Sequence, residues 1–302
     1  MIQLTSVHNG NGKERYILKK SLCERVQSLV KRERVELCHL ICHHTQSIDY
    51  PTFAYVVMKS SLIDELSFIY LNRLPNEWFS ELFVDYIRHY EDRRSTMTYT
   101  DGILNLLVIA TAYLNDLERC KHFLKLSSYA NINNCEFCFG SPLHICSVKN
   151  YLDLAKFLIS ISTCDLNART SNARKTPLHC AIIQNNFDIV ELLIQDGRTR
   201  LDLNALTQLG HTPLYLAAYY NSIECCQRLL REKLRIQIDR YEPNWNLTPL
   251  HIACSKGHAE IVRLLMENGA NAYAIERSNV GMTPLMKALC NGNVSTIRYL
   301  VV

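Results

Sequence analysis

A short phrase of Ser or Thr, then Pro and Leu, recurs through the second half of the chain at nearly constant spacing. It begins at Ser141, Thr176, Thr212, Thr248 and Thr283, so the steps between starts are 35, 36, 36 and 35 residues. Repeats of about 20–50 residues build elongated arrays in which each unit packs on its neighbours. This spacing therefore predicts a solenoid, and it constrains the fold more than any single site does.

The stretch Leu247 to Met266 is the best-preserved copy of the repeat and predicts two short helices joined by a turn. Thr248 is a good helix N-cap, and Pro249 fits the first helical position because its missing N–H has no partner there. Gly257 supplies the positive φ of the turn. The second helix presents an apolar stripe of Ile261, Val262, Leu264 and Leu265. Two such short helices bury their stripes only against neighbouring units.

Three further positions agree across the five copies. Counted from the Ser or Thr, the fifth residue is always small: Cys146, Ala181, Ala217, Ala253 and Ala288. The ninth is Asn or Gly, the residues that most readily adopt the left-handed conformation: Asn150, Asn185, Asn221, Gly257 and Gly292. The seventeenth is always Leu: Leu158, Leu193, Leu229, Leu265 and Leu300.

This pattern resembles the ankyrin repeat, whose signature is a period of about 33 residues with the phrase T-P-L-H-x-A. The resemblance covers Asn131 to Val302 and implies an all-α solenoid of helix-turn-helix units with short β-hairpin connections. In this family the His of the phrase hydrogen-bonds to the Thr. Tyr215 and Met286 replace that His in two copies, which the resemblance implies are less rigid.

The rest of the chain divides into three predicted parts. Residues 1–12 are expected to be a flexible leader, and 13–100 an all-helical region that caps the solenoid or continues it as degenerate repeats. The solenoid is expected over 101–302, with one degenerate repeat before the five clear ones. Ala110 supports the degenerate repeat because it lies 36 residues before Cys146.

Composition excludes several functional classes. The net charge of +4 argues against general nucleic-acid binding, and no apolar stretch approaches the roughly 18–20 residues of a membrane span. The chain begins without the apolar segment of a signal peptide. Its 13 cysteines, an odd number without framework spacing, fit a reducing compartment, so we expect a cytoplasmic or nuclear protein.

Two clusters contain Cys or His residues of the kind that bind metal ions, but we interpret both as structural. Within Cys38 to His44, Cys38 and Cys42 stand one helical turn apart, as do His39 and His43, which is also typical of a helix with half-buried cysteines and solvated histidines. Cys135 and Cys138 form a C-x-x-C, but the nearest further ligands belong to the repeat. Cys225-Cys226 occupies apolar positions of a second helix. No catalytic motif occurs, so neither an enzyme nor a cofactor is predicted.

The remaining candidate is a surface for protein partners. In ankyrin solenoids the hairpin tips and the exposed side of the first helices form a concave face that binds partners. By this resemblance, the predicted partner-binding residues are Phe137, Arg174, Lys175, His211, Tyr219, Tyr220, Trp245 and Lys256. Tyr219, Tyr220 and Trp245 are expected near one another as aromatic anchors with a polar rim, unless they pack on their own repeats.

Two functional interpretations remain open. The chain is an interaction module acting as an adaptor or scaffold, or it is the regulatory or targeting part of a larger enzyme or channel that continues beyond residue 302. The last repeat ends on the apolar run Tyr299 to Val302, without a polar capping repeat. We therefore expect either a fragment of a longer protein or a docking partner at this end.

Overall fold

The computed structural model describes residues 108–126, 132–133, 140–196, 200–277 and 280–301. The chain divides into two compact units, Met1–Asn131 and Ile132–Val302. In the first unit, residues 108–113 are helical and α7 spans Leu117–Leu126. The predicted leader at 1–12 and the helical region at 13–100 lie outside the described residues, so the domain boundaries stay predictions.

The second unit consists of paired helices that alternate along the chain. The first helix of each pair is α8 (Pro142–Lys149), α10 (Pro177–Ile183), α12 (Pro213–Tyr220), α14 (Pro249–Lys256) or α16 (Pro284–Cys290). The second is α9 (Leu152–Ser160), α11 (Phe187–Asp196), α13 (Ile223–Leu230), α15 (Ala259–Glu267) or α17 (Val294–Leu300).

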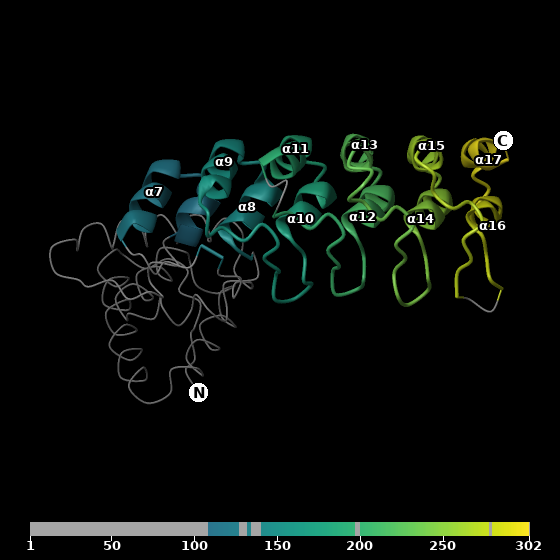
Figure 1. Cartoon of the computed structure of the whole chain (residues 1–302), viewed down its shortest axis with the longest axis horizontal. Helices are drawn as coiled ribbons and strands as arrows, with labels where there is room; N and C mark the ends of the chain where they lie inside the picture. Colours follow the sequence, from purple (N-terminus) through teal and green to yellow (C-terminus); the bar gives the residue numbers. More distant parts are fainter. Residues whose placement is uncertain (1–107, 127–131, 134–139, 197–199, 278–279, 302) are drawn as a thin grey trace, which may run out of the picture. The chain divides into compact units, whose positions relative to one another are not determined.

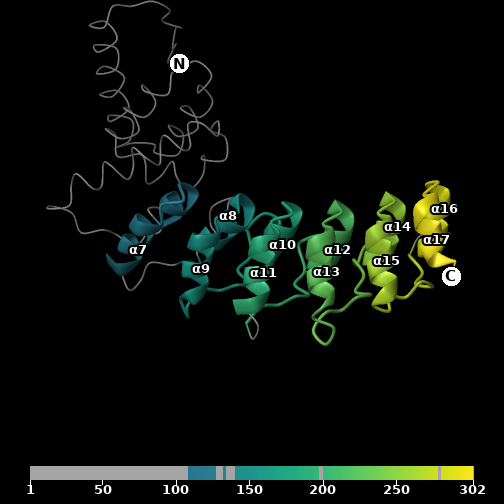
Figure 2. The same cartoon turned by 90° about the horizontal axis from the view of Figure 1, so that it is seen from above.

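The first helices lie side by side in one row and the second helices in another (Figures 1 and 2). Long loops connect each pair to the next and project from the row of first helices (Figure 1). Backbone hydrogen bonds close these loops as hairpins, for example from Thr207 N–H to the His211 carbonyl oxygen at 3.1 Å. Within the described ranges the loops contain turns but no regular strand. The predicted all-α solenoid of helix-turn-helix units is confirmed.

The turn inside each pair has the backbone conformation that the sequence predicted. The Asn or Gly at the ninth position of the repeat adopts a positive φ in all five copies, with values of 60°, 55°, 58°, 76° and 66° at Asn150, Asn185, Asn221, Gly257 and Gly292. Asn and Gly tolerate this left-handed region, so the chain reverses within a few residues. The second helix of each pair is thereby directed back along the first.

Small residues let adjacent first helices approach closely. The fifth residue after each Ser or Thr has no exposed surface in any copy: Cys146, Ala181, Ala217, Ala253 and Ala288. The Leu at the seventeenth position is equally buried in the first four copies: Leu158, Leu193, Leu229 and Leu265. The core is therefore a continuous layer between the two rows of helices, and each repeat contributes to its neighbours' burial.

Polar side chains tie each second helix to the preceding repeat. Asn186, Ser222, His258 and Asn293 each stand immediately before a second helix, and we call them the N-cap ladder. Each donates a hydrogen bond to a carbonyl oxygen near the end of the first helix of the preceding repeat, at 2.8, 3.0, 2.9 and 2.7 Å respectively. The accepting carbonyl groups belong to the last turn of a helix, where the regular pattern of hydrogen bonds within the helix ends.

A second set of side chains ties the loops together. The Asn133 amide accepts the Asp165 N–H at 2.7 Å and donates to the Thr163 carbonyl oxygen at 2.8 Å. Asn167 and Asn204 form equivalent pairs with the loop of the next repeat. Neighbouring loops are thus held in fixed register, which positions the surface that they present.

Candidate functional site

The first helices and their loops form a rigid platform because the Thr-Pro-Leu-His phrase satisfies the start of each helix. The Thr176 N–H donates to His179 Nδ1 at 3.1 Å, and the Thr176 hydroxyl lies 2.8 Å from the same nitrogen. A backbone N–H only donates, so Nδ1 is unprotonated and Nε2 carries the hydrogen. That Nε2 lies 3.2 Å from the His211 carbonyl oxygen of the next repeat, to which it donates.

The other two histidines of the phrase make the same bridge. His144 Nε2 lies 2.9 Å from the Lys175 carbonyl oxygen, and His251 Nε2 lies 3.2 Å from that of Met282. Burial lowers the pKa of His144 and of His179 to about 4, and it also lowers the pKa of His251. The predicted bond between this His and its Ser or Thr is confirmed. These imidazoles are neutral structural links with both nitrogens occupied.

A polar side chain also fixes the shape of each loop. Both oxygens of the Glu242 carboxylate accept backbone N–H groups, one from Asn244 at 2.9 Å and one from Trp245 at 2.5 Å. In the preceding loops the hydroxyls of Thr170 and Thr207 do the same at 3.0 and 3.1 Å. The backbone of each loop tip is therefore held from within, and the side chains there are free to face solvent.

Three of the predicted partner-binding residues form one exposed cluster at the ends of α12 and α14, which we call the Tyr219 cluster. The rings of Tyr219 and Tyr220 meet edge to face with centroids 5.0 Å apart. Lys256 Nζ, from the neighbouring repeat, lies 4.5 Å from the Tyr219 ring centroid, within the range of a cation–π interaction. The two rings are 38% and 48% exposed, so they remain available to a partner.

Trp245 lies elsewhere on the platform. It stands in the loop before α14, whereas the Tyr219 cluster lies at the far ends of α12 and α14. An eight-residue helix is about 12 Å long, and the structure therefore separates Trp245 from the two tyrosines by roughly that length. The indole is 59% exposed and its backbone carbonyl oxygen accepts the Arg277 N–H at 2.8 Å.

The other predicted residues occupy the loops. Arg174 is exposed at a loop tip with φ of 51°, and Lys175 beside it is half-buried. His211 stacks on Tyr215 with centroids 4.4 Å apart and planes 13° apart, so its ring is partly used in packing. Phe137 lies outside the described residues.

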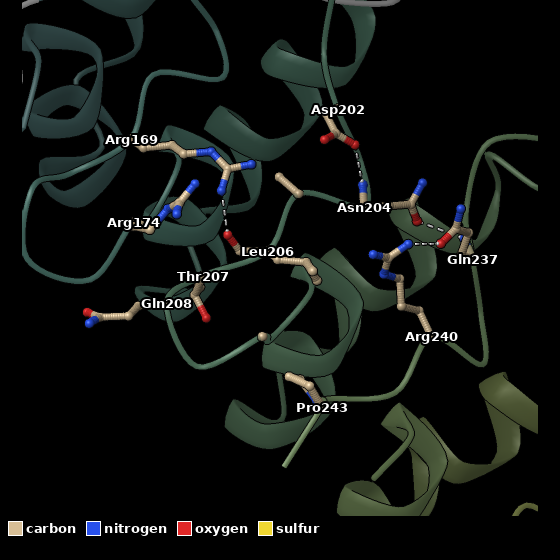
Figure 3. A pocket seen from close by; sticks show the side chains of 12 residues that line it. Arg169, Arg174, Asp202, Asn204, Leu206, Thr207, Gln208, Gln237, Arg240 and Pro243 are labelled. Carbon is tan, nitrogen blue, oxygen red and sulfur yellow. Dashed lines mark hydrogen bonds between the residues drawn. The ribbon is translucent and has the colours of Figure 1, made fainter. Parts of the chain in front are cut away.

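A hollow of about 540 Å³ opens between three successive loops, and the sequence did not predict it (Figure 3). Arg169 and Arg174 come from the first loop and lie beside each other at one end; Arg240, from the third loop, lies at the other end (Figure 3). The second loop forms the floor through residues 204–208.

The buried cysteines of the described repeats are packing residues. Cys225 and Cys226 have no exposed surface, and burial raises the pKa of the two thiols to about 11 and about 12. Their interpretation as small apolar residues is confirmed. Among the described residues no group of three His, Cys, Asp or Glu side chains is arranged to hold a metal ion. Cys38 to His44 and Cys135 to Cys138 lie outside those residues.

Comparison with known proteins identifies the family. The family model of ankyrin repeats (three copies) matches residues 107–204, 144–242, 199–276 and 237–302. The chain belongs to the ankyrin repeat family. Ankyrin repeats bind other proteins, which agrees with a platform whose exposed groups are aromatic and basic.

Two relatives show how widely these repeats are used. The mouse B-cell lymphoma 3 protein homolog is 34% identical over 167 residues, which cover 53% of this chain and 36% of that protein. Human transient receptor potential cation channel subfamily A member 1 is 28% identical over 171 residues, covering 54% of this chain and 14% of the channel. The chain thus matches well under half of the length of either relative.

Solved structures support the fold. The crystal structure of the ankyrin repeat domain of Bcl-3 aligns with a TM-score of 0.59 and 22% identity, over 64% of this chain and 84% of that one. An ankyrin repeat domain from Acinetobacter baumannii aligns with a TM-score of 0.56 and 24% identity, over 64% and 95% respectively. Within the described part of this chain, no helix is long and apolar enough to cross a membrane.

Proposed function

We propose that this protein is a non-catalytic adaptor or scaffold that captures a protein partner on the concave face of its solenoid. The observation that carries the proposal is the Tyr219 cluster, in which two neighbouring repeats present adjacent aromatic rings and a lysine to solvent. Tyrosine rings contribute a large contact area at a low cost in conformational entropy, and interface hot spots are enriched in them. The hydrogen-bonded first helices hold these rings in place before any partner arrives.

The separation of Trp245 from the cluster defines the kind of partner segment that fits both. A chain in extended conformation rises about 3.3 Å per residue, so roughly four residues span the length of α14. We propose that a partner segment of this length or longer lies along α12 and α14. One of its side chains packs against Tyr220 and another against Trp245.

The test begins with affinity capture from cell lysate and mass spectrometry, followed by purification of the partner so identified. The double variant Tyr220→Ala/Trp245→Ala is expected to weaken that partner's binding about tenfold or more, because both residues are exposed anchors. Leu234→Ala is the matched control, since this leucine is fully exposed but lies in the loop that follows the outer helix α13. Unchanged melting temperatures would show that both variants fold. Equal affinity of the double variant and the wild type would refute the site.

A second candidate function is the regulatory or targeting part of a larger enzyme or channel. The human cation channel supports it, because the region that matches this chain is only 14% of the length of that protein. Sequencing the full-length transcript distinguishes the two proposals. A reading frame that continues beyond Val302 into a catalytic or membrane domain would favour the second; a stop codon there would favour the first.

We propose a cytoplasmic or nuclear location. The support is the number of unpaired thiols, since seven of the eight cysteines in the described residues are buried and reduced, which suits a reducing compartment. Imaging of a tagged full-length protein tests this. Fluorescence confined to the secretory pathway would contradict it.

A further inference from the structure

The hollow between the loops contains several positively charged side chains that form no ion pair with the described residues. Arg169, Arg174 and Arg240 line it, against one carboxylate, that of Asp202. Asp202 accepts the Asn204 N–H at 2.9 Å, so its charge is directed toward the backbone of its own loop. Asp239, in the adjoining hollow, likewise accepts the Asn271 N–H at 2.9 Å.

The three guanidinium groups keep most of their donors available. Arg169 donates from Nη1 to the Leu206 carbonyl oxygen at 2.9 Å, and Arg240 donates from Nη1 to Gln237 Oε1 at 2.7 Å (Figure 3). Arg174 makes no side-chain hydrogen bond or ion pair within the described residues. A guanidinium has five N–H donors, so these single bonds orient Arg169 and Arg240 without saturating them.

Two arginines of the second helices, Arg228 and Arg263, behave differently. Arg228 pairs with Glu191 of the preceding repeat and with Glu232 at 3.1 Å. Arg263 pairs with Glu260 and with Glu267 at 2.6 Å. Both therefore have carboxylate partners, whereas no ion pair is formed among the described residues by any of the three arginines in the hollow. The hollow thus presents three guanidinium groups that no ion pair of the described residues neutralises.

An apolar wall adjoins the arginines. A second hollow of about 510 Å³ shares Leu206, Gln237, Arg240 and Pro243 with the first. Asp239 and Tyr241 complete its lining, and Tyr241 is half exposed. The combined surface offers guanidinium groups on one side and an aromatic ring with a proline on the other. It suits a ligand that carries carboxylates next to an apolar side chain.

The hollow is built before any ligand arrives. A Cβ added to Gly210, whose φ is 78°, would stand 2.1 Å from Pro243 Cδ in the next loop, so the two loops are packed backbone to ring. The Asn204 amide donates to the Arg235 carbonyl oxygen at 2.7 Å and accepts the Gln237 N–H at 2.8 Å. Both contacts hold the second and third loops at a fixed separation. A preorganised site avoids the cost of ordering its loops on binding.

We propose that this hollow binds an acidic linear segment of a partner protein, with Asp or Glu side chains on Arg169, Arg174 and Arg240 and a neighbouring apolar side chain against Tyr241 and Pro243. Arginine binds carboxylates through paired N–H donors, which gives both charge complementarity and orientation. The inference rests on the proposed function in one respect, that the acidic segment belongs to a protein partner. It adds the chemistry of that partner.

The test uses the full chain and a fluorescein-labelled peptide of about twelve residues in which Asp and Glu alternate with Leu. Fluorescence anisotropy measures its affinity. Arg174→Gln/Arg240→Gln is expected to weaken binding about tenfold or more, because two charge-assisted contacts are lost. Arg231→Gln/Arg298→Gln removes the same charge from exposed positions outside the hollow and is expected to change affinity less than about twofold.

Three controls make the result decisive. A peptide with Asn and Gln in place of Asp and Glu is expected not to bind, and binding of that peptide would refute the role of the arginines. An equal loss of affinity in both double variants would show a diffuse charge effect and overturn the proposal. The proposal would also be overturned if a single-stranded oligonucleotide of equal charge bound more tightly than the acidic peptide and lost this binding in Arg174→Gln/Arg240→Gln. The site would then select phosphate.

The proposed function and this inference fail separately. Tyr220→Ala/Trp245→Ala leaves the hollow unchanged and is expected to bind the acidic peptide with wild-type affinity. Loss of partner capture with retained peptide binding in this variant is the result expected if both proposals are correct. Retained partner capture in that variant refutes the aromatic site alone, while absence of peptide binding in the wild type refutes the acidic ligand alone.

Discussion

The five clear repeats divide into two groups at a single position of their shared phrase. In the repeats that begin at Ser141, Thr176 and Thr248, a His links its own helix start to a carbonyl oxygen of the next loop. In the other two repeats, Tyr215 is buried and stacks on His211, while Met286 is 47% exposed. The same backbone is thus stabilised at this position by hydrogen bonds in three repeats and by ring packing at Tyr215, whereas the half-exposed Met286 contributes little burial.

The comparison shows that the phrase has two separable roles. Thr212 and Thr283 still cap their helices, since each side chain accepts an N–H although the phrase has no His at its fourth position. Starting a helix therefore needs only Thr and Pro, whereas the link to the next repeat needs His. The expectation that the repeats with Tyr215 and Met286 are less rigid therefore depends on how much this His-to-carbonyl hydrogen bond contributes to stability.

The largest expected effect is a loss of stability in acid. The pKa of His144 and of His179 is lowered by burial from 6.5 to about 4, so the unfolded chain binds more protons between these pH values. Stability contributed by these two groups is therefore complete above pH 6.5 and falls as the pH drops toward 4. The free energy of unfolding is expected to decrease by on the order of 2 kcal/mol per histidine at pH 5.

Urea denaturation at pH 7 and pH 5, at constant ionic strength, measures this decrease. Most Asp and Glu carboxylates are still ionised at pH 5, so the histidines dominate the change in this window. An unfolding free energy that is the same at both values would contradict neutral, hydrogen-bonded imidazoles in the fold.

Removing one link is expected to have the next largest effect. His179→Ala leaves the Thr176 N–H and the His211 carbonyl oxygen without their partner and opens a cavity, at a cost of about 3 kcal/mol. Met286→Ala, at the same position of the last repeat, removes a half-exposed side chain and is expected to cost about 1 kcal/mol or less. Urea midpoints of both variants at pH 7 test the difference. Equal losses would abolish the distinction between the two groups.

The smallest effect is expected when one group is converted into the other. Tyr215→His allows an Nε2 donor to reach the Leu247 carbonyl oxygen, the position equivalent to the acceptors in the other repeats. The new bond is offset by the lost stack on His211, so the unfolding free energy is expected to change by less than about 1 kcal/mol. Additional destabilisation between pH 7 and pH 5 would show that the link had formed. Its absence would mean that the loop carbonyl is out of reach.

The sequence predicted the repeating scaffold because each of its determinants is local. Thr248 and Pro249 specify a helix start by themselves, and Gly257 specifies a left-handed residue by itself. Such rules depend on neighbours within a few positions of the chain, and the five copies reinforced one another. The helix starts and the φ values of the turns accordingly match the prediction.

The candidate surfaces depended on distances between repeats, which local rules do not supply. Lys256 was placed on the concave face, but its position over the Tyr219 ring follows from the register of α12 against α14. The hollow was missed because Arg169 and Arg240 are 71 residues apart and become neighbours only through an intervening loop. Trp245 was grouped with the tyrosines because all three belong to adjacent repeats, although Trp245 precedes the start of α14 and the tyrosines stand at the end of α12.

The N-cap ladder has a mechanical consequence. Each of its four side chains stands before the second helix of one repeat and donates to a carbonyl oxygen at the end of the first helix of the preceding repeat. A repeat that opens therefore removes a hydrogen bond from its neighbour, so we expect the unfolding of adjacent repeats to be coupled. We also expect a load applied along the solenoid to be distributed over several repeats before any one of them unfolds.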